Sequence, residues 1–159
     1  MYQTGFYVKI NSMNLTFKNL LKLIILPSLV YIINDTFQFL APEFYLLYSV
    51  DTFSHFLGGI AIAYSASYAL SLIEKRRWIA IQKNILRCGI ILSVVMTIAV
   101  WWEFYEFLYD YFIDTSSYLF VMQPSVADTI KDLYMGMFGT IVFCIVMLYR
   151  ADKKIIHKI

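Results

Sequence analysis

The chain is 159 residues long, enough for one domain, and 60% of its residues are hydrophobic while only 15% are charged. Soluble domains are about 45–50% apolar and about 25% charged, and so small a domain buries only part of its surface. The mean hydropathy of +0.66 therefore excludes a water-soluble monomer and indicates an integral membrane protein. The net charge of +2 is too small to indicate nucleic acid as a partner. We expect membrane lipids as partners, and we leave open whether the chain forms a homo-oligomer.

Four apolar segments are each long enough to cross a bilayer as a helix, which takes about 20 residues. They are residues 20–40, 52–73, 85–108 and 126–149. These segments predict an all-α fold, a four-span transmembrane helix bundle. On this prediction, residues 1–19 form a cytoplasmic N-terminal segment, residues 20–149 the four-helix transmembrane domain, and residues 150–159 a basic cytoplasmic tail.

Lysine and arginine are concentrated in alternate connections between the segments. They precede the first segment, join the second to the third, and follow the fourth: Lys9, Lys18, Lys22, Lys75, Arg76, Arg77, Lys83, Arg87, Arg150, Lys153, Lys154 and Lys158. The other two connections contain neither residue type. Because basic residues stay on the cytoplasmic side, both termini and the middle connection are predicted to be cytoplasmic. The sequence thus predicts a multi-pass inner-membrane protein with the N-in, C-in orientation.

Acidic and histidine side chains form pairs in the outer halves of the second, third and fourth segments. Asp51 and His55 are four residues apart, so they share one face of the second helix. The other two pairs are Glu103 with Glu106 on the third helix and Asp128 with Asp132 on the fourth. Each helix therefore offers two oxygen or nitrogen ligands at a similar depth in the membrane.

Ionised carboxylates at membrane depth cost several kcal/mol each unless something neutralises them. The basic residue nearest to these pairs, Lys131, lies about 100° around its helix from Asp132. Bound divalent cations, shared protons and hydration in an outward-open cavity could each balance the charge. A cation fits best, because hard ions prefer carboxylate oxygens and an added imidazole suits zinc, iron or manganese. We expect a divalent metal ion as cofactor, with six candidate ligands: Asp51, His55, Glu103, Glu106, Asp128 and Asp132.

Structural interpretations of the same residues stay open. Asp51 and Asp128 begin helices, where an aspartate caps free N–H groups. The other four candidates lie one or more turns inside, where the alternative is a hydrogen-bonded network that only specifies packing. Glycines of the second and fourth helices, Gly58 and Gly139 among them, are typical of closely packed membrane helices. We interpret the aromatic residues around Trp102 as an outer aromatic belt rather than a ligand-binding box.

Three runs of residues, occurring in one order, carry a resemblance to a known family. They are the Asp-Thr-Phe-Ser-His-Phe-Leu-Gly-Gly run at 51–59, the Trp-Trp-Glu-Phe-Tyr-Glu run at 101–106, and residues 128–139, which begin Asp-Thr-Ile-Lys-Asp. Over about residues 51–139 the chain resembles the YjdF-type membrane proteins of unknown function and, more distantly, VanZ-like proteins. The resemblance implies a multi-pass inner-membrane protein without an established reaction. It marks Asp51, His55, Phe56, Gly59, Glu103 or Glu106, Asp128, Thr129 and Asp132.

The leading functional hypothesis is a metal-binding membrane protein that acts as a hydrolase or transferase on lipid-linked or envelope substrates. A bound metal would activate water or polarise a phosphate or carbonyl oxygen. His55, Glu103 and Glu106 are the catalytic candidates, as proton carriers. The alternatives are a proton or metal-cation transporter or channel, and a non-catalytic assembly subunit. The inner halves of the last three spans are poor in polar residues, which favours the first hypothesis over transport, and whether the chain is an enzyme stays open.

Overall fold

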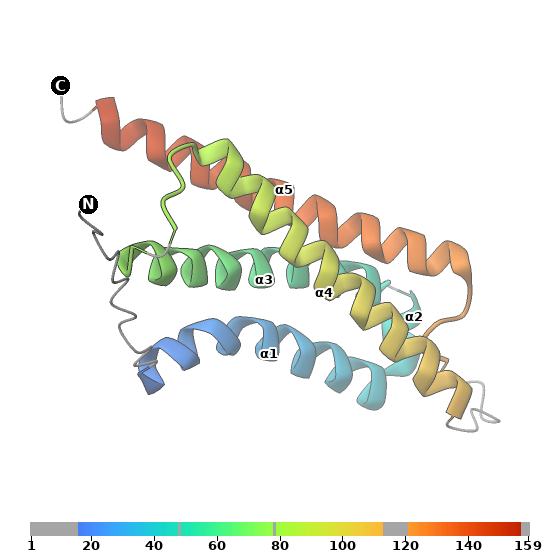
Figure 1. The fold of residues 1–159 in the computed structure, drawn as a ribbon. Coiled ribbons are helices and arrows are strands. Elements are labelled where there is room, and N and C mark those ends of the chain that lie inside the picture. Colours follow the sequence, from blue (N-terminus) through green and yellow to red (C-terminus); the bar gives the residue numbers. More distant parts are fainter. Residues whose placement is uncertain (1–15, 48, 78, 113–120, 157–159) are drawn as a thin grey trace, which may run out of the picture.

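The computed structural model describes residues 16–47, 49–77, 79–112 and 121–156, with side chains up to residue 151, and five helices lie within these ranges (Figure 1). The long helices are α1 (Phe17–Leu40), α3 (Val50–Lys75), α4 (Asn84–Phe112) and α5 (Val126–Ile156), and α2 (Pro42–Leu47) is short. Each long helix is long and apolar enough to cross a membrane. The all-α, four-span fold predicted from the sequence is therefore confirmed.

Helix boundaries extend beyond the predicted segments. The last helix begins at Val126, as predicted, but continues to Ile156, past the predicted end at residue 149. Arginine, alanine and lysine in this stretch favour helix, and their polarity ends the membrane segment rather than the helix. The short helix α2 was not predicted, because its six residues are too few for a periodic pattern to emerge.

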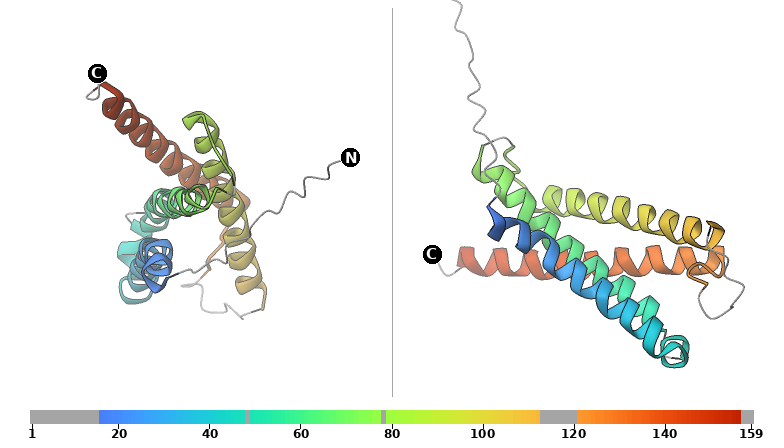
Figure 2. Two further views of the ribbon diagram at one scale, coloured as in Figure 1. Left: turned by 60° about the vertical axis from the view of Figure 1, so that its left-hand side comes forward. Right: turned by 90° about the horizontal axis from the view of Figure 1, so that it is seen from below.

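The long helices surround α3. Helix α3 contacts α1, α4 and α5, and α4 also contacts α5, whereas α1 contacts α2 and α3 (Figures 1 and 2). Within the described residues the backbones of α1 and α4 stay apart, and the rings of Tyr31 and Trp102 meet edge to face between them, with centroids 5.5 Å apart. The bundle is therefore open between the backbones of α1 and α4, on one side of α3, and this ring pair bridges the opening.

Glycines allow the backbones of α3 and α5 to approach closely. A Cβ atom on Gly59 would lie 2.1 Å from the carbonyl oxygen of Gly136, and one on Gly139 would lie 2.1 Å from that of Phe56. The predicted packing role of Gly139 is therefore confirmed, and Gly59 has the same role. For Gly58 the prediction is wrong, because a Cβ atom there would meet nothing within 4 Å and would point into open space.

A proline inside α1 explains how this helix is attached to α3. Pro27 has no N–H group, so the carbonyl oxygen of Leu23, four residues earlier, lacks its usual helical donor. The Ser65 hydroxyl of α3 donates a hydrogen bond to this oxygen at 2.7 Å. Inside a membrane such a carbonyl must find a partner within the protein, so the bond both satisfies the backbone and joins the two helices.

Next to the acidic pairs, on the side nearer the Lys75 end of α3, the bundle contains an apolar core. It consists of Ala63, Ala66, Cys88, Ile91, Val95 and Cys144. Both cysteines are free and buried, as small apolar thiols in a core are expected to be. On helix α3 the core starts eight residues from His55, about 12 Å along the axis.

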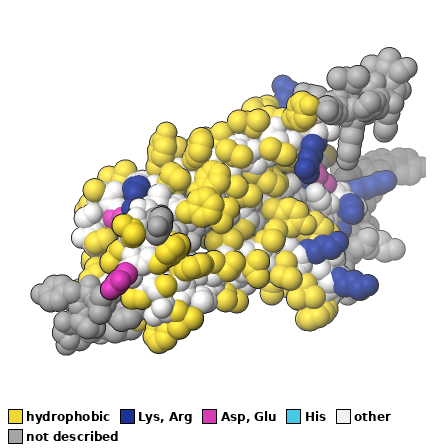
Figure 3. Space-filling model, turned by 180° about the vertical axis from the view of Figure 1, so that it is seen from behind, with side chains coloured by type: hydrophobic (Ala, Val, Ile, Leu, Met, Phe, Trp, Pro, Cys, Tyr) yellow, Lys and Arg dark blue, Asp and Glu magenta, His cyan; other side chains and the backbone are white. Residues whose placement is uncertain are grey.

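Apolar side chains cover the middle of the outer surface, and most of the basic side chains on the face seen in Figure 3 gather at one end. Large apolar residues such as Ile24, Leu29, Ile98 and Ile145 are exposed. Such a surface is unfavourable in water but suits lipid tails. The N-in, C-in orientation stays a prediction.

Candidate metal centre

Five of the six candidate ligands converge where α3, α4 and α5 meet. They form two groups that share His55: Asp51, His55 and Asp132, and His55, Glu103 and Glu106. In each group, one ligand atom per residue lies within 4.8 Å of the others. Two ligands on opposite sides of an ion at about 2.2 Å would be about 4.4 Å apart. Small side-chain movements would therefore let either group surround a cation.

The Asp51 carboxylate is oriented by a residue from α2. The Tyr45 hydroxyl donates to Asp51 Oδ1 at 2.9 Å, and the side-chain amide of Asn34 lies 3.1 Å from the same hydroxyl. Burial, together with the neighbouring Asp51 charge, raises the pKa of the Tyr45 hydroxyl, which therefore stays a donor. His55 Nε2 lies 3.5 Å from Asp51 Oδ1. Asp51 thus faces Tyr45 and His55, and the residue at the N-cap position of α3 is Ser49.

The two glutamates of α4 are buried, with 5% of Glu103 and 6% of Glu106 exposed. Trp102 Nε1 donates to Glu106 Oε1 at 2.7 Å, so this tryptophan contacts the cluster, and the aromatic belt stays a prediction. Gln123 Nε2 lies 3.3 Å from Glu103 Oε2 and 2.7 Å from Thr129 Oγ1. The second oxygen of Glu103, Oε1, is buried and has no hydrogen-bond partner among the described residues.

The aspartates of α5 separate into one that joins the cluster and one that does not. Asp132 is only 2% exposed, and its buried Oδ1 has no hydrogen-bond partner in the described part of the chain. Asp128 belongs to neither ligand group, and its carboxylate pairs with Lys131. Lys131 Nζ also lies 3.8 Å from Asp132 Oδ1, since the long side chain spans the angle between their positions. The backbone N–H of Asp128 donates to Ser125 O at 3.0 Å and to Ser125 Oγ at 3.2 Å, so Ser125 supplies a capping oxygen at the start of α5.

Sequence reasoning missed Tyr45, Asn34 and Gln123 as neighbours of the cluster. Tyr45 and Gln123 lie in the predicted connections and Asn34 lies within the first span. Nothing in their spacing relates them to the acidic pairs. Gln123 is held in place because its backbone N–H donates to Asp110 Oδ2 at 2.7 Å. Asp110 therefore holds residues 122 and 123 beside the end of α4.

The cluster opens into a cavity of about 440 Å³ between α1, α3 and α4, which Asp51 and His55 help to line. This volume lies in the range of small-molecule sites, about 300–1,000 Å³. Chemically, the centre combines one imidazole, several carboxylates and two buried oxygens without donors. Such a set suits cation binding and proton transfer beside an apolar chamber.

Comparison with known proteins gives a family but no characterised relative. The family described as predicted membrane protein (DUF2238) matches residues 6–153. No curated protein and no solved structure matches the chain. The family match includes the first span, which lies outside the resemblance over residues 51–139. The chain belongs to the DUF2238 family of predicted membrane proteins.

Proposed function

We propose that this membrane protein binds a divalent metal ion at His55, with carboxylate ligands from Asp51 and Asp132 or from Glu103 and Glu106. We further propose that the bound ion serves a hydrolase or transferase reaction on lipid-linked or envelope substrates. A divalent ion would supply Lewis acidity toward a phosphate or carbonyl oxygen. Asp128, outside both ligand groups, is the weakest of the six candidate ligands.

The observation that carries this proposal is the pair of buried carboxylate oxygens without hydrogen-bond donors in the described residues, Glu103 Oε1 and Asp132 Oδ1. Buried polar atoms in native proteins nearly always have a partner. A network that only specified helix packing would have satisfied them, because partly satisfied networks destabilise a bundle. Both residues share a ligand group with His55, so one or two cations there would complete their coordination.

The remaining polar groups have roles around this centre. His55, Glu103 and Glu106 are the groups that could hold or move a proton. Tyr45 orients Asp51, and Trp102 orients Glu106, through their hydrogen bonds. Partners of this kind commonly contribute 10–100-fold to metal affinity.

Transport is less well supported. A pathway for cations or protons needs polar groups or water across the whole membrane. Beyond the cluster, toward the Lys75 end of α3, the apolar core formed by Ala63, Ile91 and Val95 packs the bundle, and the cavity that extends beside it has a largely apolar lining. This arrangement favours a centre that is approached from one side.

The location belongs to the same proposal. We place the protein in the inner membrane with both termini cytoplasmic, so that the cluster lies in the outer half of the bilayer. The division at residues 19 and 149 into cytoplasmic ends and a transmembrane domain, and a relation to YjdF-type and VanZ-like proteins, are proposed on the sequence patterns given above.

The decisive measurement is elemental analysis of the purified full chain, loaded with zinc or manganese and passed over a desalting column. We expect about one or two equivalents of metal per chain. His55→Ala and Asp132→Asn should lose most of it, whereas Glu43→Gln, at an exposed position of α2, should retain it. Wild-type protein that retains no metal, or variants that retain as much as wild type, would refute the metal centre.

A further inference from the structure

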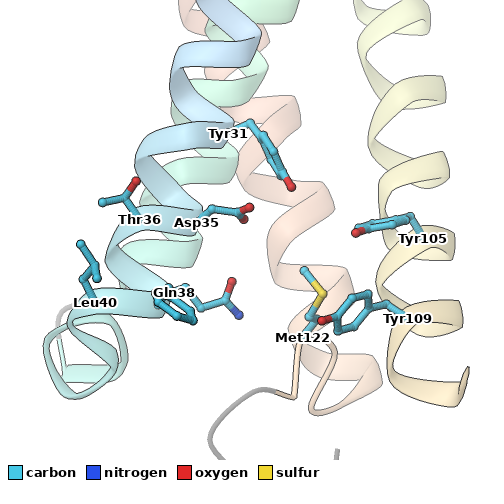
Figure 4. Close-up of a pocket in the computed structure, with 9 residues that line it drawn as sticks. Tyr31, Asp35, Thr36, Gln38, Leu40, Tyr105, Tyr109 and Met122 are labelled. Carbon is cyan, nitrogen blue, oxygen red and sulfur yellow. The ribbon is translucent and has the colours of Figure 1, made fainter. Parts of the chain in front are cut away.

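Two cavities lie end to end in the opening between α1 and α4. The inner one, of about 440 Å³, has a largely apolar lining that includes Leu23, Pro27, Val30, Val95, Ile98 and Ala99. The outer one, of about 560 Å³, is lined by residues that include Tyr31, Asp35, Gln38, Tyr105, Tyr109 and Met122 (Figure 4). Tyr31 lines both cavities, so they adjoin at this residue, whose ring packs edge to face against that of Trp102.

The dimensions of the inner cavity match those of a lipid chain in one leaflet. Its lining on α1 runs from Leu23 to Asn34, twelve residues that rise about 16 Å along the helix. Half of a hydrocarbon core of about 30 Å is about 15 Å. The apolar part of the lining lies toward the middle of α1, and the polar part lies toward the Leu40 end. The tail and headgroup of a lipid in that leaflet follow one another in the same order. This match holds whichever side of the membrane the outer end faces.

The outer cavity has the chemistry of a site for an ammonium group. The carboxylate of Asp35 points into it from α1, and the rings of Tyr105 and Tyr109 point toward it from α4 (Figure 4). No lysine, arginine or histidine is among the described residues that line it. A carboxylate with tyrosine rings attracts a cationic ammonium group through charge and cation–π contacts, whereas a purely anionic headgroup would be repelled.

Polar groups of the metal centre face the inner cavity near its outer end. Asn34, Asp51 and His55 all line it, beyond the apolar lining formed by Leu23 and Pro27. A lipid with its tail in the inner cavity and its headgroup in the outer one would present the linkage between them to these three residues. In a phospholipid that linkage is the phosphodiester.

We propose that the opening between α1 and α4 binds one phospholipid with an ammonium headgroup, drawn sideways from the bilayer. Its hydrocarbon chain occupies the inner cavity, its ammonium group lies at Asp35, and its phosphate faces His55. The contact of the phosphate with a cation at His55 rests on the proposed metal centre. The chain and headgroup positions rest on the two cavities alone.

The inner cavity can be filled without disturbing the helices. Gly58 lines it, and a Cβ atom there meets nothing within 4 Å, so Gly58→Leu places a bulky side chain in the cavity and adds a better helix former. Ala99→Phe does the same from α4. Gly89→Leu is the matched control, because Gly89 is exposed, has equally open space at its Cβ position, and does not line the cavity.

The test uses the purified full chain, equilibrated with nanodiscs of equal parts phosphatidylethanolamine and phosphatidylglycerol and re-extracted in detergent. Lipid retained per chain is measured by native mass spectrometry, and metal content is measured on the same samples. We expect about one phosphatidylethanolamine per wild-type chain, at least fivefold more than phosphatidylglycerol. Gly58→Leu and Ala99→Phe should lower it at least tenfold, and Gly89→Leu should not change it.

The headgroup position is tested separately. Asp35→Asn should remove the preference for phosphatidylethanolamine, whereas Glu43→Gln, a carboxylate on α2 that does not line the cavities, should keep it. Equal retention in Gly58→Leu and Gly89→Leu would overturn the lipid site even if metal is bound. An unchanged preference in Asp35→Asn would overturn the headgroup position. Loss of lipid in Gly58→Leu from a protein that never binds metal would support the lipid site and overturn the metal centre.

Discussion

Replacement of Glu103 by Gln distinguishes a ligand cluster from a packing network. Glu103, Glu106 and His55 each contribute a ligand atom within 4.8 Å of the others. Two unit charges at that separation repel by about 3.5 kcal/mol at an effective dielectric constant of about 20. Gln has nearly the same shape without the charge, so Glu103→Gln removes this repulsion while keeping an amide partner for Gln123.

The substitution should have opposite effects with and without metal. In chelator at pH 8, we expect the free energy of unfolding to rise by about 1–3 kcal/mol, less than the full repulsion because His55 already offsets part of it. For a chain of this size each kcal/mol raises Tm by about 2–4 °C. In metal at 100 times Kd, wild type gains about 2.7 kcal/mol, and the variant loses most of that gain with its ligand.

The assay is thermal unfolding in detergent, followed by tryptophan fluorescence, in chelator and in zinc or manganese. Glu43→Gln, at an exposed site on α2, should follow wild type in both conditions. Lowering the pH to about 5.5 should shrink the metal gain of wild type, because the ligands must lose protons to bind. If Glu103→Gln lowered Tm equally in chelator and in metal, Glu103 would be a packing residue and the reasoning above would be wrong.

Four further outcomes test the surrounding structure. Tyr45→Phe should weaken metal binding about 10–100-fold by calorimetry, because it removes the donor to Asp51; unchanged affinity would contradict this. Gly139→Ala should lower the free energy of unfolding by about 1–3 kcal/mol, since its Cβ atom would overlap the carbonyl of Phe56, whereas Gly89→Ala should not lower it. Ser65→Ala should cost about 1–3 kcal/mol alone, but little in a Pro27→Ala background that restores the N–H group; equal costs would exclude the proposed pairing. Impermeant thiol reagents should label Glu43→Cys from outside and Lys83→Cys only after lysis, and the reverse would invert the topology.

The spans and the convergence of the acidic pairs could be predicted because both follow from local periodicity. A run of about 20 apolar residues has no stable place outside the membrane. A spacing of three or four residues puts both side chains on one helix face. Since that face cannot be turned to lipid without a large penalty, the faces of the last three spans had to meet. His55, Glu103 and Asp132 do so.

The neighbours of the cluster could not be predicted, since they depend on which helices touch and how the connections run. Gly58 and Gly59 are adjacent and identical in type, yet Gly59 contacts α5 and Gly58 faces a cavity. That difference comes from the angle between α3 and its neighbours, which hydropathy does not encode. Tyr45 reaches Asp51 only because α2 folds back beside α3.

The position of Lys131 illustrates a limit of arguments from helix rotation. Its Cα atom lies about 100° from that of Asp132, but its side chain reaches both Asp132 and Asp128. Long basic side chains carry their charge several bonds from the backbone. Rotation therefore predicts contacts of short side chains such as aspartate better than those of lysine.

The arrangement of the two cavities, the ligand cluster and the apolar core determines how lipid and water would reach a reaction at the proposed metal centre. On the proposal above, lipid would enter the opening between α1 and α4 from the side, and the outer cavity is bordered by polar side chains such as Asp35 and Gln38, to which water can hydrogen-bond. Toward the Lys75 end of α3, the apolar core and the largely apolar lining of the inner cavity disfavour water beyond His55. A phosphodiester at the junction would then meet water from one direction only, opposite its own tail. That geometry favours cleavage or transfer at the headgroup over passage of the lipid across the membrane, because a lipid moved through would need its polar part to cross the core.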